Sequence, residues 1–323
     1  MTLLLLTTTC CVGQQKVDTG YVANFKLPYS IRFTLEKTGA GLEISPDNTL
    51  SAPTASFPFN SGINAGINVS YKFLNFSISK SLESSTKNSS LVFATKFYSG
   101  ANVFGGKIGF YKNVASLNDS KNLDLKSSIR LFKFSPYWMI NTNIKRYSFA
   151  AVTDYSQIQK KSAGAFIFEI NPSLVIANGN NEDIIPDNIY YRSIFENMAG
   201  LSKVTILNVD FRPGYAYTKV FEEGEYFIGG GIFLGPGFGY HSLNAIDKSA
   251  GLHWQSSLRL SATAGLHREK YFLVAGFRYT NSFTPVKTIG ILSDEGSFAF
   301  TFGLRLGELE KAIPKTFGEI IHR

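Results

Sequence analysis

The sequence SFAFTFGLRL at residues 297–306 decides the fold class, because it alternates strictly between two kinds of side chain. Every even position from Phe298 to Leu306 is Phe or Leu, while the odd positions are Ser, Ala, Thr, Gly and Arg. Successive side chains of a β-strand point to opposite faces. The pattern therefore predicts a strand with one apolar face and one face of small or polar residues.

The same alternation runs through residues 226–241 and 253–267, and its second face is unusual. That face is built from Gly, Ser and Thr with scattered Arg, rather than from Lys and Glu. A soluble barrel or sandwich would alternate in the same way with its apolar face inward, but its exposed face would need many charged residues. The composition favours an all-β fold: a single transmembrane antiparallel β-barrel, apolar toward lipid and small and polar inside.

The overall composition agrees with a membrane barrel. Only 17% of the residues are charged, where soluble domains average about 25%, and aromatic residues reach 14%. The sequence has no run of about 20 apolar residues, the length that a transmembrane helix requires. The net charge of +8 is not concentrated in one stretch, so we expect no nucleic-acid partner. Basic residues at the rim of an outer-membrane barrel would meet lipid phosphates instead.

Four segments are predicted along the chain. An apolar core from Leu3 to Leu6 and the small residues Cys11-Val-Gly13 indicate a cleaved secretory signal, with lipidation of Cys10 or Cys11 as the alternative. The predicted location is the bacterial outer membrane, with both termini periplasmic. The segments are a signal peptide at 1–13, a periplasmic lead-in at 14–27, the barrel at 28–306 and a polar periplasmic tail at 307–323.

Between 12 and 14 strands are predicted, joined alternately by short periplasmic turns and long outer loops, as is typical of such barrels. A strand is predicted at 146–154 and an outer loop at 155–161. Asn171-Pro172 separates two short strands at 162–170 and 173–177, and the count falls to 12 if 162–177 is one bent strand. The longest loop, 178–203, fits a short helix near its end and either plugs the barrel mouth or lies over it.

Several segments resemble one family. These are Tyr147–Ala151, the run QKKSAG at 159–164, Ile185-Pro186, Gly214–Tyr217 and Val69–Phe73. Together they are similar to the domain of unknown function 4421 family of Bacteroidota outer-membrane barrels. The resemblance spans roughly residues 28–306, and the tail beyond Leu306 exceeds the family pattern. It implies an outer-membrane β-barrel and no particular activity.

An outer-membrane lipid-modifying enzyme of the acyl hydrolase type is the alternative function. Such an enzyme needs Ser and His on one strand face at one height. His241 and Ser242 are adjacent, so they lie on opposite faces, whereas His253 and Ser257 share a face but stand too far apart along a strand. We identify no catalytic residue, no metal-ligand spacing and no cofactor motif, and we favour a non-enzymatic barrel.

Inward-facing arginines are the main candidates for function. A two-residue turn at Arg268-Glu269 predicts that Arg259 and Arg278 face each other inside the barrel. Like charges so placed repel, so a carboxylate or a bound anion must offset them. The candidate lumen residues are Arg32, Glu36, Asp210, Arg212, Arg259, Arg278 and Arg305.

Two interpretations of these arginines remain open. One is a small pore or binding cavity for anionic solutes, and the other is a salt-bridge lattice that fills a narrow barrel. Replacing Arg259 and Arg278 by Gln should lower anion preference in planar-bilayer recordings if the first holds. Separately, Gln159, Lys160 and Lys161 are predicted at an outer loop edge, where they contact lipid phosphates or a partner, or are simply solvated.

Overall fold

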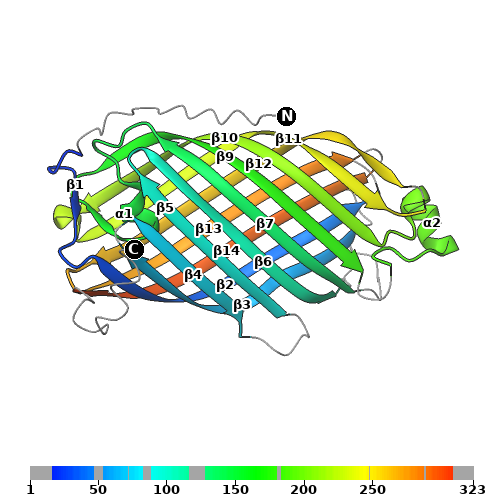
Figure 1. The fold of residues 1–323 in the computed structure, drawn as a ribbon, viewed down its shortest axis with the longest axis horizontal. Coiled ribbons are helices and arrows are strands. Elements are labelled where there is room, and N and C mark those ends of the chain that lie inside the picture. Colours follow the sequence, from blue (N-terminus) through cyan, green and yellow to red (C-terminus); the bar gives the residue numbers. More distant parts are fainter. Residues whose placement is uncertain are drawn as a thin grey trace, which may run out of the picture.

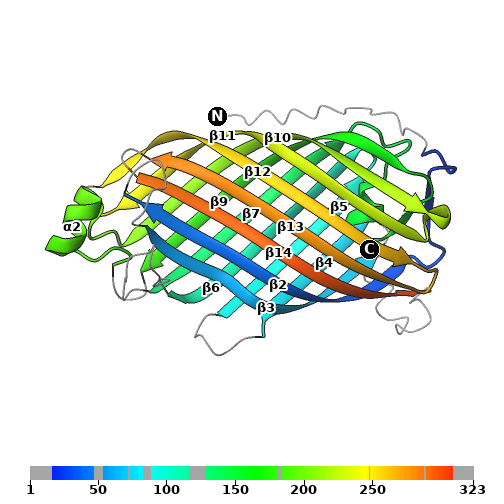
Figure 2. The ribbon, with the colours of Figure 1, turned by 180° about the vertical axis from the view of Figure 1, so that it is seen from behind.

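Twelve antiparallel strands form one closed barrel (Figures 1 and 2). The computed structural model describes residues 17–46, 54–71, 73–82, 89–115, 128–179, 183–246, 248–286 and 289–307. Strand β14 pairs with β2, which closes the ring. The barrel strands are β2 Tyr29–Ser45, β3 Ala55–Tyr71, β4 Leu74–Ser81, β5 Ser89–Ser99, β6 Asn102–Ala115, β7 Ser128–Asn141, β9 Ala163–Gly179, β10 Lys203–Phe221, β11 Tyr226–Asn244, β12 Ser249–His267, β13 Tyr271–Val286 and β14 Ile289–Leu306.

The apolar face of the strands points outward. Phe298, Phe300 and Phe302 are 46%, 60% and 40% exposed, and Trp254 is 73% exposed. Water would oppose such a surface, and a hydrocarbon bilayer favours it. The predicted transmembrane β-barrel is thus confirmed, with aromatic and aliphatic side chains toward lipid. No helix in the described part of the chain is long and apolar enough to cross a membrane.

The count of 12 strands lies within the predicted range of 12 to 14, and two segments decide it. Residues 146–154 do not form a strand: Phe149–Thr153 is the helix α1, whose first turn is capped by the Ser148 hydroxyl accepting from the Ala151 amide at 3.0 Å. Asn171-Pro172 does not end a strand either, since β9 continues through both residues in register with β10. Proline lacks a donor but tolerates extended backbone, so the chain stays straight enough to pair.

The segment between β7 and β9, residues 142–162, occupies the end of the barrel that carries the tight turns. We call this end the turn end and the segment the turn-end plug. The plug contains α1 and β8 (Gln157–Gln159), which pairs with β1 (Val22–Asn24). The prediction of an outer loop at 155–161 is therefore wrong, because β7 and β9 are joined at the turn end (Figure 1).

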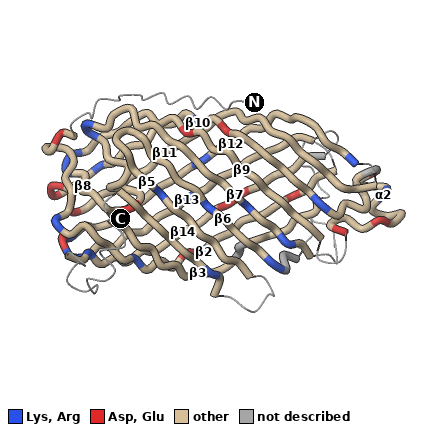
Figure 3. The backbone as a smooth tube through the Cα atoms, viewed as in Figure 1, with Lys and Arg blue, Asp and Glu red and all other residues tan. Residues whose placement is uncertain are grey.

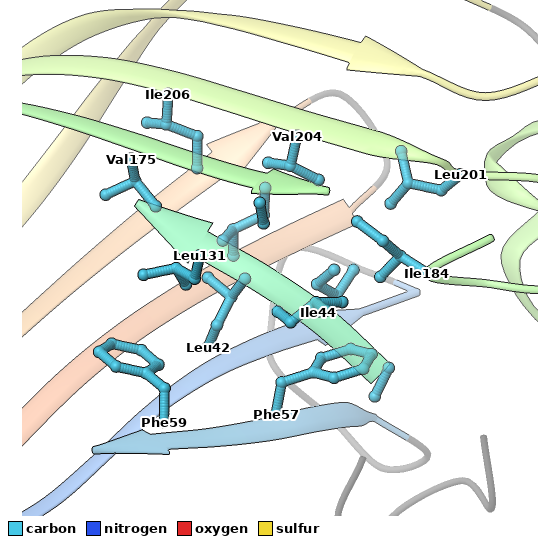
Figure 4. Packing of buried hydrophobic residues seen from close by; sticks show 14 of the residues in the cluster. Leu42, Ile44, Phe57, Phe59, Leu131, Val175, Ile184, Leu201, Val204 and Ile206 are labelled. Carbon is cyan, nitrogen blue, oxygen red and sulfur yellow. The ribbon is translucent and has the colours of Figure 1, made fainter. Parts of the chain in front are cut away.

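Apolar side chains fill the opposite end, the loop end. The 183–202 segment carries α2 (Ile189–Phe195) and a 3-10 turn (Glu196–Met198), so the helix predicted in this loop is present. Its fully buried residues Ile184, Ile185 and Leu201 pack against inward-facing residues such as Phe57 and Leu42 (Figure 4). We call the apolar residues that this segment contributes the loop-end plug: Ile184, Ile185, Phe195, Met198 and Leu201.

Other predictions fall outside the described residues. The signal peptide at 1–13 and nearly all of the tail at 307–323 lie there, so they remain predictions. Residues 17–27 of the lead-in are described and run along the turn end, where β1 lies against the plug.

Candidate functional site

A cavity of about 430 Å³ lies inside the barrel between the two plugs. Many of its lining residues are polar or charged, while apolar residues such as Leu42, Val175 and Ile206 also border it. Lys, Arg, Asp and Glu positions are distributed along the strands of the barrel wall (Figure 3). Seven Lys and Arg and five Asp and Glu side chains line it, so the cavity carries a formal surplus of two positive charges. We call this cavity the chamber. The charged lining residues are Arg32, Glu36, Lys96, Lys107, Lys133, Asp154, Glu169, Asp210, Arg212, Arg259, Arg278 and Glu295.

Asp154 anchors the turn-end plug to the barrel wall. Its carboxylate pairs with Lys96 at 3.0 Å and with Arg32 at 3.7 Å, and Tyr98 donates a hydrogen bond to it. Burial alone would raise the pKa of Asp154, but the charges of Lys96 and Arg32 and the bond from Tyr98 lower the pKa overall. The carboxylate is therefore held ionised between its two cations.

Two further carboxylates each hold two cations inside the barrel. Glu295 on β14 pairs with Lys107 and Lys133, the second at 3.3 Å. Glu169 on β9 pairs with Arg212 at 2.7 Å and with Arg259 at 2.5 Å.

The guanidinium of Arg259 also lies over the Phe233 ring at 4.0 Å. Much of the positive lining is thereby arranged as ion pairs.

Arg278 differs from these cations. The register pairs Arg259 with Thr280 and Arg278 with Ser261, so the predicted Arg259–Arg278 opposition is wrong by two residues. The connection at 268–270 is longer than the two-residue turn on which that prediction depended. Among the described residues, Arg278 has no carboxylate within ion-pair distance, and its side chain is exposed to the chamber.

The remaining lumen candidates have separate surroundings. Glu36 lines the chamber, and its charge acts on Lys107. Asp210 also lines it and accepts a hydrogen bond from Gln255. Six of the seven predicted lumen residues thus border the chamber.

Arg305 is the exception. It is buried at the turn end, where it donates to the carbonyl of Tyr155 at 2.8 Å and stacks on Phe25 at 3.3 Å. Arg305 holds the plug rather than lining the chamber.

Gln159, Lys160 and Lys161 lie at the turn end and not at an outer loop. Gln159 is buried and donates through Nε2 to the carbonyl of Arg146 at 2.6 Å, and its Oε1 accepts from the Ser148 amide at 2.9 Å. Lys160 and Lys161 are exposed, and the ammonium of Lys161 lies 5.4 Å from the ring of Tyr21. Gln159 therefore acts within the plug, and only the two lysines are available at the surface.

Sequence reasoning missed a buried polar chain near the loop end. His253 Nε2 lies 2.7 Å from Asn208 Oδ1, and its Nδ1 lies 3.4 Å from Nδ1 of His241. His241 Nε2 in turn lies 3.5 Å from the Ser249 hydroxyl. The β11–β12 register, which pairs Leu243 with Ser249, brings Ser249 and His241 to one face. This contact depends on the register of β11 with β12, which the sequence alone does not set.

The described residues hold no group of three His, Cys, Asp or Glu side chains placed to bind a metal ion. The ion-pair partners Lys96, Asp154, Glu169 and Glu295 were also absent from the predicted site. Glu169 had a signal, since it is an acidic residue at an inward position of an otherwise apolar run, AFIFEI at 165–170. No sequence signal indicated Asp154, because residues 146–154 were predicted to form a strand.

The family is established by sequence. Residues 16–305 match the family model described as Domain of unknown function (DUF4421). The chain belongs to this family. A search of curated proteins gives no significant match.

Solved structures similar to this DUF4421 protein are outer-membrane barrels. Neisserial surface protein A is 8% identical, with 86% of this chain and 97% of that chain covered and a TM-score of 0.24. The toluene transporter TodX of P. putida is 7% identical, with coverages of 87% and 91% and a TM-score of 0.32. OmpT, an outer membrane protein of Vibrio cholerae, is 9% identical, with coverages of 86% and 98% and a TM-score of 0.27. Likeness at this level carries no information about function.

Proposed function

We propose that this protein is an outer-membrane barrel of the Bacteroidota that binds a small anionic group in its chamber, and that its turn end and both termini face the periplasm. The observation that carries the proposal is Arg278. Its guanidinium is the one cation among the described chamber residues without an ion-pair partner, and it faces a cavity with a positive surplus. A carboxylate or phosphate group is the natural complement of an accessible guanidinium.

A closed binding barrel is favoured over an open pore. Described side chains fill the loop end, and the turn-end plug is tied down by Asp154 and Arg305. Much of the salt-bridge lattice predicted as the alternative is present as well, so the chamber combines a fixed lattice with one available cation. A porin-like role is the alternative form of this proposal, and it requires that one of the two plugs moves.

The experiment is anion binding by the purified protein in detergent. Arg278→Gln should weaken binding of an alkyl phosphate probe, dodecyl phosphate, by at least about tenfold, since a charge-assisted hydrogen bond contributes roughly 1.5–3 kcal/mol. Arg130→Gln is the matched control, because Arg130 is an exposed arginine on β7 that does not border the chamber. Equal affinity of both variants would reject the proposal.

An acyl hydrolase is the second candidate, and the Ser249–His241 contact is the observation that favours it. The two groups stand 3.5 Å apart on one face, with His253 and Asn208 behind them. Ser249 and His241 are only 2% and 4% exposed, and neither borders the chamber, so a substrate has no described access to them. Ester hydrolysis by the wild type that disappears in Ser249→Ala would establish this candidate.

A further inference from the structure

The barrel wall is interrupted between β7 and β9. The two strands pair from Ile129 with Gly179 to Phe134 with Leu174, and again from Trp138 with Ile170 to Asn141 with Ile167. The register is the same on both sides, yet residues 135–137 and 171–173 form no ladder pairs with each other. We call these two short segments the seam. At its centre the register sets Pro136 opposite Pro172.

The two prolines explain the interruption. Proline has no N–H, so opposed prolines cannot exchange the two hydrogen bonds that a bonded antiparallel pair makes. Proline is normally confined to edge strands or bulges, and two on neighbouring interior strands are unusual. Here Asn171 Nδ2 donates to the carbonyl of Pro136 at 2.8 Å in place of a backbone donor. At this height a side-chain bond takes the place of the ladder.

A second interruption lies on the other side of the β9–β10 pair. Pairing between β10 and β11 stops at Asp210 with Gly237 and resumes at Gly214 with Phe233. Pro213 and Pro236 lie within this second gap. The β9–β10 ladder itself is continuous from residue 203 to residue 218. The β9–β10 pair therefore has an interruption of three residues in its ladder to the wall at each of its two edges.

The chamber lies directly behind the seam. Ser135, Tyr137, Asn171 and Ser173 face inward from the seam and border the chamber. The ring of Tyr137 lies over Gly105 on β6, where a methyl group would collide with it, so the ring is turned away from β9. On the lipid side, the seam is flanked by exposed aromatic residues of β7, Phe134 and Trp138.

Cations stand immediately inside. Glu169, two residues from Asn171, holds Arg212 and Arg259, and the charges of Arg259 and Arg278 both act on Tyr137. A molecule that crossed the seam head first would therefore meet guanidinium groups with its head while its tail still contacted lipid.

We propose that the seam is a lateral portal through which an amphipathic anion, an acyl chain with a carboxylate or phosphate head, passes between the bilayer and the chamber. This inference rests on the proposed anion site and deepens it by naming the ligand class and its route. Side chains of the two plugs occupy the ends of the barrel, whereas the seam joins the chamber to hydrocarbon across a part of the wall that already lacks its ladder bonds. The head binds at Arg278, and the chain lies between the apolar outer side chains of the seam.

The test closes the seam with a disulfide. The register sets Ser135 opposite Ser173, both inward, so Ser135→Cys with Ser173→Cys can be oxidised across it. Ser257→Cys with Ser282→Cys is the matched control, because these serines are paired in the unbroken β12–β13 ladder. Both pairs are made with Cys10 and Cys11, the cysteines of the sequence, replaced by Ser.

Binding is followed in lipid vesicles by stopped-flow tryptophan fluorescence, to which Trp138 beside the seam and Trp254 contribute. The probes are dodecyl phosphate, dodecanoate, neutral dodecanol and inorganic phosphate. We expect oxidation of the seam pair to slow association of the anionic amphiphiles at least tenfold and reduction to restore it, while the control pair has no effect. Dodecanol and inorganic phosphate should bind at least tenfold more weakly than the two anionic amphiphiles.

The outcomes separate the two proposals. Unchanged association after seam oxidation, with binding that still depends on Arg278, overturns the portal and leaves the anion site standing. Inorganic phosphate binding as tightly as dodecyl phosphate overturns the lipidic ligand. If the wild-type protein binds none of the anionic probes, both proposals are overturned. Slower association after seam oxidation supports the portal, and a preference for dodecanoate over dodecyl phosphate, or the reverse, then identifies the head group.

A second variant covers failure of the disulfide protein to fold. Pro136→Val with Pro172→Val restores both missing N–H donors, so the ladder can close. We expect this variant to slow association and Asn171→Ala to speed it. Equal association rates in the wild type, in the double proline variant and in Asn171→Ala would overturn the portal.

Discussion

Glu169 is the residue whose loss should damage this barrel most. Its carboxylate is 2% exposed and contacts Arg212, which is 4% exposed, and Arg259, which is 14% exposed. Glu169→Gln keeps the shape of the side chain but removes the charge. Two guanidinium groups are then left beside each other in a site from which water is largely excluded.

The expected destabilisation follows from those contacts. One ion pair at about 4 Å in a medium of effective dielectric 20 is worth roughly 4 kcal/mol, and Glu169 makes two at shorter distance. Part of this is offset because the carboxylate no longer has to be desolvated and because Gln still accepts a hydrogen bond. Removing one partner of a buried pair typically costs about 3–5 kcal/mol, and we expect Glu169→Gln to fall in that range.

The assay is urea unfolding of the vesicle-bound protein, followed by tryptophan fluorescence. Trp138 reports locally, since it pairs with Ile170 next to Glu169. Adding Arg259→Met should recover part of the loss, because one uncompensated charge disappears. Glu223→Gln, in an exposed turn, is the control and should change stability by less than about 0.5 kcal/mol. A loss below about 1 kcal/mol, or strict additivity of the double variant, would refute the reasoning.

Three further outcomes are expected. The lowered pKa of Asp154 means that its stabilisation is complete above about pH 4 and is lost as the pH falls through the folded-state pKa. The difference in unfolding free energy between the wild type and Asp154→Asn should therefore shrink below about pH 4. A constant difference down to pH 2 would contradict this. Gly303→Ala should destabilise by about 1–3 kcal/mol in urea unfolding because its methyl group would collide with the buried Phe272 ring, whereas Gly276→Ala, where the nearest atom is 3.6 Å away, should not. Ile184→Asp places a charge in the fully buried loop-end plug and should raise conductance in planar bilayers several-fold; unchanged conductance would show that the plug does not close the barrel.

The sequence was sufficient for the fold class and for the direction of each face. The alternation at 297–306 needs only the two-residue period of a strand, and the structure exposes the row of Phe298 and buries Thr301 and Arg305 on the other side. Local chemistry also predicts the helix in the 178–203 loop. These features depend on residues near one another in the chain, so a pattern in the sequence is enough to reveal them.

Long-range pairing decided the rest. A shift of two residues in one hairpin separated Arg259 from Arg278, gave Arg259 to Glu169 on a distant strand and left Arg278 available in the chamber. Ion pairs of Asp154 with Lys96 and Arg32 hold the turn-end plug, residues 142–162, in the barrel. The local sequence does not predict which strands carry these partners. The periodicity of a strand sets the face on which a side chain lies, but it does not set the strand that lies beside it. Closure of the barrel decides which strands pair, and Pro136 and Pro172 oppose each other only because β7 and β9 lie side by side.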